Sequence, residues 1–351
     1  MKVLQSPIFF ENGCAAALGT FDGVHLGHQR VISVAVKSGF TPVVIMIMQK
    51  NRKKRIFSDE LNFSFLAELG VDTVICLDLD EIRDMNPNEY LEMLYEKMNV
   101  RLFVCGENHR FGKGACGSFE DISRFCAQKG IVSEKCDTVT VNGVTASSTA
   151  IRQLISNGEM KAAYSLMGHC YAIDFSVIRG DGRGHEMGFP TINQQYGETY
   201  ILPKFGVYAG VALVDDKEYP AVLNVGIRPT FLTDKPLAET HIIGYSGDLY
   251  DKKICVMFKE HIRNEKTTPH HAACPCRHSR TGTDKSQHPR QRPQRHQVRI
   301  HHQEHGWQRR LRQRQSETRQ MEIRKDLAGR RTHTLHRPIR ITETRQQERR
   351  R

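Results

Sequence analysis

The first half of the chain alternates short apolar runs with longer segments in which apolar residues recur every three or four positions. Short runs of this kind are typical of buried strands, and the periodic segments are typical of amphipathic helices. The predicted strands are residues 14–18, 42–48, 71–77, 100–105 and 131–135, and the predicted helices are residues 27–37, 87–98, 119–128 and 148–156. This alternation predicts a doubly wound α/β domain with a parallel sheet, which binds ligands at the carboxyl ends of its strands.

The pattern changes after about residue 170, where short β-like runs are separated by Gly, Pro and Asp turns. These runs are residues 173–179, 207–214, 221–225, 239–243 and 253–258. Closely spaced short strands of this kind predict a small antiparallel β-barrel. We therefore expect one domain over residues 1–168 and a second over residues 169–266.

Residues 267–351 differ from both domains in composition and charge. They carry 22 Lys+Arg against 7 Asp+Glu, whereas residues 1–266 carry 29 against 32, so this segment holds the whole basic excess. With so little apolar surface, the segment cannot offset the entropy lost on folding. We expect it to be disordered.

Three interpretations of this basic segment are open. We favour a reading-frame shift that replaced the native C-terminus, because Arg-, His- and Pro-rich text without periodicity is typical of an alternative frame. The rival is a genuine basic arm that binds RNA or DNA through counterion release. The third is a metal site, although Cys-x-Cys is not the usual zinc spacing. Its candidate ligands are His270, His271, Cys274, Cys276 and His278.

The remaining bulk features predict a cytoplasmic protein. The N-terminus, MKVLQSPIFFENG, lacks a signal-peptide pattern, and no apolar run approaches the roughly 20 residues that span a bilayer. Eight cysteines are scattered without a Cys-x-x-Cys pair, which favours free thiols in a reducing compartment. They are Cys14, Cys76, Cys105, Cys116, Cys126, Cys136, Cys170 and Cys255.

The stretch ALGTFDGVHLGHQRVI, residues 17–32, places His25 and His28 between a predicted strand and a predicted helix. The start of a helix exposes backbone N–H groups and carries a partial positive charge, so it attracts phosphate. Imidazoles there can donate hydrogen bonds to phosphate oxygens and stabilise charge that develops on a triphosphate. The alternatives are metal ligation or a solvated loop, but nothing nearby in sequence supplies the other ligands of a closed zinc site.

Three motifs of the first domain resemble those of the bacterial bifunctional riboflavin kinase/FAD synthetases. LGTFDGVHLGH resembles the family's G-x-F-D-G-x-H-x-G-H, GENHRFGKGACG (106–117) its glycine loop, and SSTAIRQLISNGEMKAAYSLMG (147–168) its S-S-T-x-I-R signature. The resemblance implies that His25 and His28 are catalytic and that Asn108 lies at the flavin. The implied ATP-phosphate ligands are Gly19, Thr20, Phe21, His25, His28, Ser147, Ser148, Thr149 and Arg152. One stretch departs: MQKNRKKRIF (48–57) stands where the family has a Phe-x-Pro-His-Pro-like loop beside the flavin.

The second domain carries IRGDGRGHEMGFPTIN (178–193), which resembles the riboflavin kinase signature G-x-G-R-G-x-x-x-G-F-P-T-x-N. The resemblance implies that Gly182 and Gly184 bind ATP phosphates and that Thr191 and Asn193 hold Mg²⁺ and phosphate. It also implies that Glu239 is the catalytic base that takes the proton of the attacking hydroxyl. After Lys266 the resemblance stops, and the family's C-terminal helix is missing.

The function implied by the resemblance is phosphorylation of riboflavin to FMN followed by adenylylation of FMN to FAD. Both steps use ATP as co-substrate and need Mg²⁺. The implied partners are the small molecules riboflavin, FMN and ATP, without a membrane. The alternative is a nucleic-acid-binding protein that acts through its basic C-terminal arm and has degraded enzyme domains.

Overall fold

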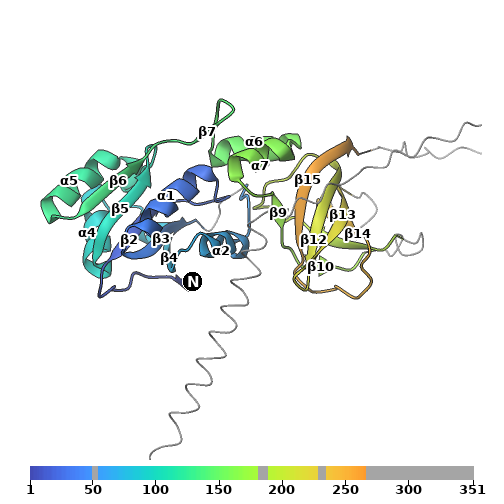
Figure 1. Cartoon of the computed structure of the whole chain (residues 1–351), viewed down its shortest axis with the longest axis horizontal. Helices are drawn as coiled ribbons and strands as arrows, with labels where there is room; N and C mark the ends of the chain where they lie inside the picture. Colours follow the sequence, from blue (N-terminus) through green and yellow to red (C-terminus); the bar gives the residue numbers. More distant parts are fainter. Residues whose placement is uncertain (50–53, 181–188, 228–234, 266–351) are drawn as a thin grey trace, which may run out of the picture. The chain divides into compact units, whose positions relative to one another are not determined.

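The computed structural model describes residues 1–49, 54–180, 189–227 and 235–265 (Figure 1). Gly182, Gly184 and the whole segment 267–351 lie outside the described residues, so the predictions made for them stay predictions. No helix in the described ranges is long and apolar enough to span a bilayer.

A six-stranded, fully parallel sheet forms the centre of the first half. Its strands are β1 (Lys2–Leu4), β2 (Cys14–Gly19), β3 (Thr41–Met48), β4 (Thr73–Asp78), β5 (Val100–Gly106) and β6 (Val132–Cys136). They lie in the order β1-β4-β3-β2-β5-β6. The chain therefore moves outward from β2 on one side and returns to the other side at β5, as a doubly wound sheet requires.

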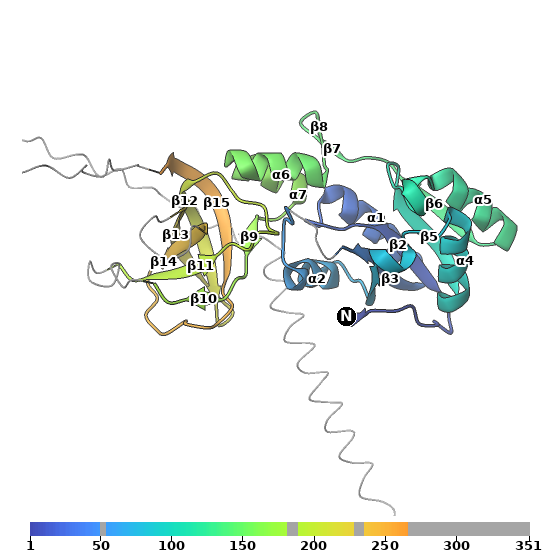
Figure 2. The ribbon, with the colours of Figure 1, turned by 180° about the vertical axis from the view of Figure 1, so that it is seen from behind.

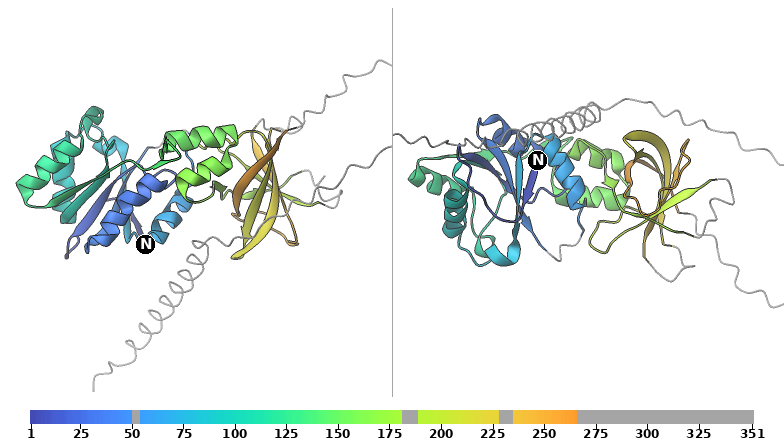
Figure 3. Two further views of the ribbon diagram at one scale, coloured as in Figure 1. Left: turned by 45° about the horizontal axis from the view of Figure 1, so that its top comes forward. Right: turned by 90° about the horizontal axis from the view of Figure 1, so that it is seen from below.

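Helices cover both faces of this sheet. The helices of the first half are α1 (Leu26–Lys37), α2 (Asp59–Glu68), α3 (Leu79–Ile82), α4 (Pro87–Met98), α5 (Phe119–Lys129), α6 (Ser148–Asn157), α7 (Met160–Met167) and the 3-10 turn η1 (Lys113–Ala115). Figure 3 shows α4 and α5 on one face and α1 on the other. Because successive strand residues point to opposite faces, Cys14, Ala16 and Leu18 pack in the same core as Tyr90 and Phe125 of α4 and α5.

Local sequence explains where the helices begin and end. At the start of α4, Asn86 and Glu89 form a capping box, and Pro87 occupies the first turn, where its missing N–H is not needed. Helix α6 begins after the cap residue Ser147 and ends at Gly158, whose φ of 78° favours glycine. The predicted doubly wound parallel sheet is confirmed.

The second half is an antiparallel sheet of seven strands. They are β9 (Ala172–Ile173), β10 (Val177–Ile178), β11 (Thr191–Gln195), β12 (Gly206–Val214), β13 (Lys217–Gly226), β14 (Leu237–Ile242) and β15 (Cys255–Asn264). The order is β10-β11-β14-β13-β12-β15-β9, and Figure 2 shows the sheet curling into a half-barrel. On β12, buried and half-buried residues alternate, which is the pattern of a sheet with one face in the core. The predicted small antiparallel architecture is confirmed.

Some elements differ from the predicted ones. The single strand predicted over residues 173–179 is two strands, because β9 pairs with β15 whereas β10 pairs with β11. The sequence prediction did not include β1, α2 or β11, nor the two-stranded hairpin formed by β7 (Thr140–Val141) and β8 (Val144–Thr145).

Candidate functional site

The histidine motif lies at the point where the strand order of the parallel sheet reverses. Strands β2 and β5 are neighbours in the sheet, and the chain leaves them toward opposite edges. The loop after β2 carries residues 20–25, and the loop after β5 carries Asn108. Both loops start from the carboxyl ends of adjacent parallel strands, which is where open α/β sheets form their binding crevice.

The loop between β2 and α1 is backbone-strained and held from several sides. Phe21, Gly23 and Val24 have φ values of 47°, 81° and 34°, and positive φ is unfavourable for a bulky or β-branched residue. Asp22, 1 % exposed, accepts a hydrogen bond from the Ile56 N–H at 3.1 Å and forms an ion pair with Arg152 at 2.5 Å. The loop conformation therefore depends on partners that are distant in sequence.

His25 and His28 stack on each other at the start of α1. Their ring centroids are 3.6 Å apart with an interplanar angle of 20°, and the Phe21 ring lies 5.1 Å from His28. His25 is also the N-cap of α1: its Nδ1 accepts a hydrogen bond from the His28 backbone N–H at 3.3 Å. A β-carbon on Gly27 would lie 3.1 Å from the His25 ring, so glycine gives the ring this space.

Burial keeps His25 neutral at physiological pH. Desolvation lowers the pKa of His25 to about 4, with a smaller opposing effect of Asp22. Because Nδ1 accepts the helix-capping bond, the remaining proton belongs on Nε2. His25 is therefore a neutral hydrogen-bond donor at a helix N-terminus, which can bind an anion without changing its own charge.

The N-terminus of α6 lies beside that of α1. The Ser148 hydroxyl donates a hydrogen bond to the Asp22 carbonyl at 2.9 Å. Gly27 also lies close to the residue before the α6 cap, since a β-carbon on Gly27 would be 3.4 Å from the Ala146 carbonyl oxygen. Ser147 caps α6 by accepting a hydrogen bond from the Ala150 N–H at 3.2 Å. Two helix N-termini thus converge on the histidine loop, and both favour negative charge.

The other residues predicted for this site differ in exposure and in their contacts. Gly19 is the last residue of β2. A β-carbon placed on Gly19 would lie 3.0 Å from the ring of Phe21. Thr20, Asn108 and Thr149 are exposed. Arg152 is engaged within the chain, because its Nε also donates to the Lys54 carbonyl at 2.7 Å.

Of the five residues predicted for the second site, the structure describes three, and these lie on neighbouring strands of the antiparallel sheet. Asn193 of β11 is directly opposite Glu239 of β14, and Glu239 is directly opposite Asn224 of β13. Thr191 is opposite His241. Residues that face each other across antiparallel strands point to the same face of the sheet, so these side chains form one polar surface.

Two pockets meet at Thr191. One, of about 370 Å³, is lined by residues that include Thr191, Asn224, Glu239, His241 and Arg263. The other, of about 670 Å³, is lined by more apolar residues; they include Val177, Ile192, Ile242, Leu249 and Tyr250. Thr240 lines the larger pocket, is fully buried, and its hydroxyl has no hydrogen-bond partner among the described residues.

Sequence reasoning assigned no role to several residues that hold these sites together. Asp22 lies within the quoted histidine motif, three residues before His25, and a carboxylate at this place next to the predicted phosphate-binding histidines is a signal of a structural ion pair. Asn224 begins the stretch NVGIRPTF (224–231), but only the strand register reveals that it is directly opposite Glu239. His169 stacks on Phe65 with centroids 4.0 Å apart, a contact that no sequence spacing predicts.

Three histidines predict a pH-dependent loss of stability. Desolvation lowers the pKa of His25, His109 and His169 from 6.5 to about 4. The unfolded chain takes up these protons near pH 6.5 and the folded chain only near pH 4. The free energy of unfolding should therefore fall as the pH decreases through this window, by up to about 1.4 kcal/mol per pH unit for each histidine.

Urea unfolding followed by circular dichroism at pH 7.0, 6.0 and 5.0 measures this loss. The pKa values of the Glu60 and Asp121 carboxyl groups are lowered from 4.5 and 3.8, so these groups titrate below pH 5.0, the lowest pH of the series. His169→Phe removes one of the three groups and should flatten the slope. A free energy of unfolding that is constant from pH 7.0 to 5.0 would contradict this prediction.

Comparisons with known proteins agree with this geometry. A family model described as FAD synthetase matches residues 9–150, and one described as riboflavin kinase matches residues 167–273. The chain is 31 % identical over 271 residues to the bifunctional riboflavin kinase/FMN adenylyltransferase of Escherichia coli K12, covering 73 % of this chain and 86 % of that protein. It is 30 % identical over 267 residues to the protein of the same description from Bacillus subtilis 168, with 71 % and 84 % covered.

A solved structure supports the fold. The crystal structure titled "Macrolide-efflux Protein" from Streptococcus pneumoniae superposes with a TM-score of 0.66 at 24 % identity, covering 75 % of this chain and 92 % of that one. At this identity the likeness concerns the fold alone. Together, the two matched domain models and the relatives, of which this chain covers most of the length, establish that the chain belongs to the bifunctional riboflavin kinase/FMN adenylyltransferase family.

Proposed function

We propose that this chain makes FAD in two ATP-dependent steps, phosphorylation of riboflavin to FMN by the antiparallel half and adenylylation of FMN by the α/β half. The observation that carries the proposal is the stacked pair His25 and His28, at the N-terminus of α1 and beside the N-terminus of α6. This arrangement concentrates hydrogen-bond donors and positive helix ends where a triphosphate binds.

In the adenylylation step, a phosphate oxygen of FMN attacks the α-phosphorus of ATP, and the bond from that phosphorus to the oxygen bridging toward the β-phosphorus breaks. Pyrophosphate leaves. No proton has to be removed from the nucleophile, because the attacking oxygen belongs to a phosphate monoester that is already ionised at neutral pH. The reaction needs alignment and neutralisation of negative charge. We assign the neutral donor His25 and its neighbour His28 to the phosphate oxygens of ATP. Two further groups are assigned to the same phosphates: Ser147, Ser148 and Thr149 at the α6 N-terminus, and Gly19, Thr20 and Phe21 at the end of β2. Asn108 then lies on the flavin side.

In the phosphorylation step, the terminal ribityl hydroxyl oxygen attacks the γ-phosphorus of ATP, and ADP leaves. We assign Glu239 as the base that accepts the hydroxyl proton. Its place in the polar pocket, opposite Asn193 and Asn224, supports this role. Because Thr191 lines both pockets, we place the reacting phosphate near Thr191, the ribityl chain in the smaller pocket and the nucleoside in the larger, more apolar one.

The Thr191 and Asn193 side chains suit Mg²⁺. The buried side-chain amide of Asn193 packs directly against Gly180. A β-carbon on Gly180 would lie only 2.2 Å from Nδ2 of Asn193, so the absence of a side chain at Gly180 makes room for this amide. Among the described residues, no three His, Cys, Asp or Glu side chains are grouped to hold a metal ion. This fits Mg²⁺, which takes few protein ligands and completes its shell with water and phosphate oxygens. Bound there, Mg²⁺ would neutralise phosphate charge.

We also propose that the two enzymatic domains meet at residues 168 and 169. Support comes from Gly168, which ends α7 with a φ of 79°, after which the chain enters the antiparallel sheet at β9. We propose the cytoplasm as the compartment, because the eight described cysteines are free. Nothing in the described residues or in the matched relatives favours the nucleic-acid alternative.

Incubation of the purified chain with Mg-ATP and either riboflavin or FMN, followed by chromatography of the flavins, tests the proposal. FMN and then FAD should form from riboflavin, and FAD should form from FMN. Both reactions should stop when EDTA removes Mg²⁺ and resume when Mg²⁺ is restored. If no flavin product forms while RNA binds in a salt-sensitive manner, the nucleic-acid alternative replaces the enzymatic one.

A further inference from the structure

A short segment before α2 connects the histidine loop to the antiparallel half. We call residues 54–58 the strap. Ile56 of the strap donates its N–H to Asp22, and the Lys54 carbonyl accepts from Arg152. The Ile56 side chain is 1 % exposed and lies against Gly23, where a β-carbon would be 2.7 Å from it. The strap therefore forms one wall of the strained loop that carries His25 and His28.

The other side of the strap pairs with the segment between β11 and β12. We call residues 199–204 the anchor segment. Arg55 donates its N–H to the Thr199 carbonyl at 2.7 Å and accepts from the Ile201 N–H at 2.9 Å, as in a short parallel bridge. The Arg55 guanidinium lies 5.6 Å from the centre of the Tyr200 ring and forms an ion pair with Asp59. Further contacts of the same junction are a 2.7 Å hydrogen bond from Ser58 to Asp174 and the ion pair between Lys253 and Glu60.

The anchor segment also contacts α6. Lys204 donates its N–H to the Ile155 carbonyl at 3.3 Å, in the last turn of the helix whose first turns carry Ser147, Ser148 and Arg152. The same six residues thus hold both elements that surround the phosphate-binding loop: the strap on one side and α6 on the other. Arg152 joins these two elements, since it bonds to Asp22 and to the strap at once.

We propose that the anchor segment positions the adenylylation site, with Tyr200 and Arg55 as positioning residues. This inference rests on the proposed function. Tyr200, a residue of the antiparallel half, would then influence the reaction of the other half. Its ring fixes Arg55 and therefore the neighbouring strap residues Lys54 and Ile56. The strap in turn holds Arg152 and Asp22 through its hydrogen bonds to them. Displacing phosphate-binding groups by a fraction of an ångström is enough to slow a reaction that depends on alignment.

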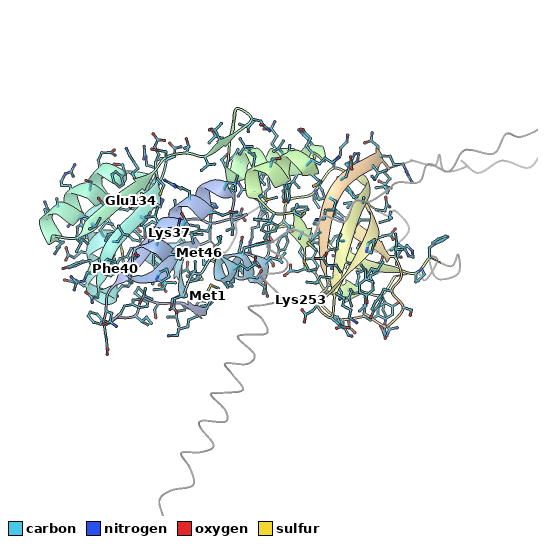
Figure 4. All side chains as sticks on the ribbon, viewed as in Figure 1. Met1, Lys37, Phe40, Met46, Glu134 and Lys253 are labelled. Carbon is cyan, nitrogen blue, oxygen red and sulfur yellow. The ribbon has the colours of Figure 1, made fainter. Side chains whose placement is uncertain are left out.

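Tyr200→Ala tests this role, because it removes the ring beneath Arg55 while leaving every group assigned to either reaction. We expect kcat/KM for ATP in FMN adenylylation to fall about tenfold and riboflavin phosphorylation to stay within about twofold. Tyr200→Phe keeps the ring and should match the parent chain. Lys253→Ala, at the residue labelled in Figure 4, breaks an exposed ion pair of the same junction and should also have little effect.

Hydrogen exchange supplies a readout that is independent of activity. The Ile56 amide, protected by Asp22, should exchange faster in Tyr200→Ala than in Tyr200→Phe. If adenylylation and Ile56 exchange are unchanged in Tyr200→Ala, or if both reactions fall in parallel, the anchor segment has no positioning role. If the parent chain makes no FAD at all, the proposed function fails instead, a result that the unmutated protein reports by itself.

Discussion

Replacement of His28 with alanine is expected to lower kcat for FMN adenylylation by about 10²- to 10³-fold and to leave riboflavin phosphorylation unchanged. A preorganised donor aimed at developing negative charge is worth this much because it is already oriented before the reaction. His28 stacks against His25 and lies beside the buried ring of Phe21, so its imidazole cannot reorient freely. Alanine removes the donor while preserving helix α1.

His25 is a less clean target than His28, because it serves the fold as well as the site. Alanine at position 25 deletes the N-cap of α1, and loss of a cap costs about 1 kcal/mol of stability. Arg30→Ala is the matched control for His28→Ala, since Arg30 is an exposed residue on the same helix. Full adenylylation activity in His28→Ala would exclude the assigned role.

Replacement of Glu239 with glutamine is expected to lower kcat for riboflavin phosphorylation by about 10²- to 10⁴-fold, without affecting FAD formation from supplied FMN. Glutamine has nearly the shape of glutamate, so the strands on either side of β14 keep their register. It has no basic oxygen to accept the proton of the attacking hydroxyl. The neighbouring amides of Asn193 and Asn224 cannot replace it for the same reason.

Separate assays of the two reactions make the Glu239 result specific. Glu260→Gln is the matched control, because Glu260 lies on β15 of the same sheet, is exposed and pairs with Lys161. It should retain both activities. If Glu239→Gln phosphorylates riboflavin at the parental rate, the proton acceptor is a different group and the polar pocket loses its catalytic assignment.

The α/β half was largely predictable because its signals are local. Apolar runs such as residues 42–48 have the length of a strand, and Asn86-Pro87 with Glu89 is a helix start that needs no distant contact. A similar signal was present at α2, where Ser58 caps the helix and Asp59 and Glu60 occupy its first turn. That helix lacked a clear apolar face, and its start follows the basic stretch interpreted as a departure from the family.

The antiparallel half was harder to predict because its strands are defined by their partners. Residues 173–179 resemble one strand, but Asp174 accepts a hydrogen bond from Ser58, and the chain passes from one neighbouring strand to another there. Thr191–Gln195 is polar enough to resemble a loop and becomes a strand only by pairing with β10 and β14. Strand formation of this kind depends on non-local hydrogen bonds.

The sequence by itself determined the fold class and the family, and it named the residue types expected to bind phosphate, because the motifs and the hydrophobic periodicity are contiguous along the chain. Only the tertiary structure decided that Arg152 is tied to Asp22 and Lys54, that Asn224 faces Glu239, and that the anchor segment supports the strap. These contacts join residues up to about 150 positions apart. Their energies depend on distance and burial, which linear order does not encode.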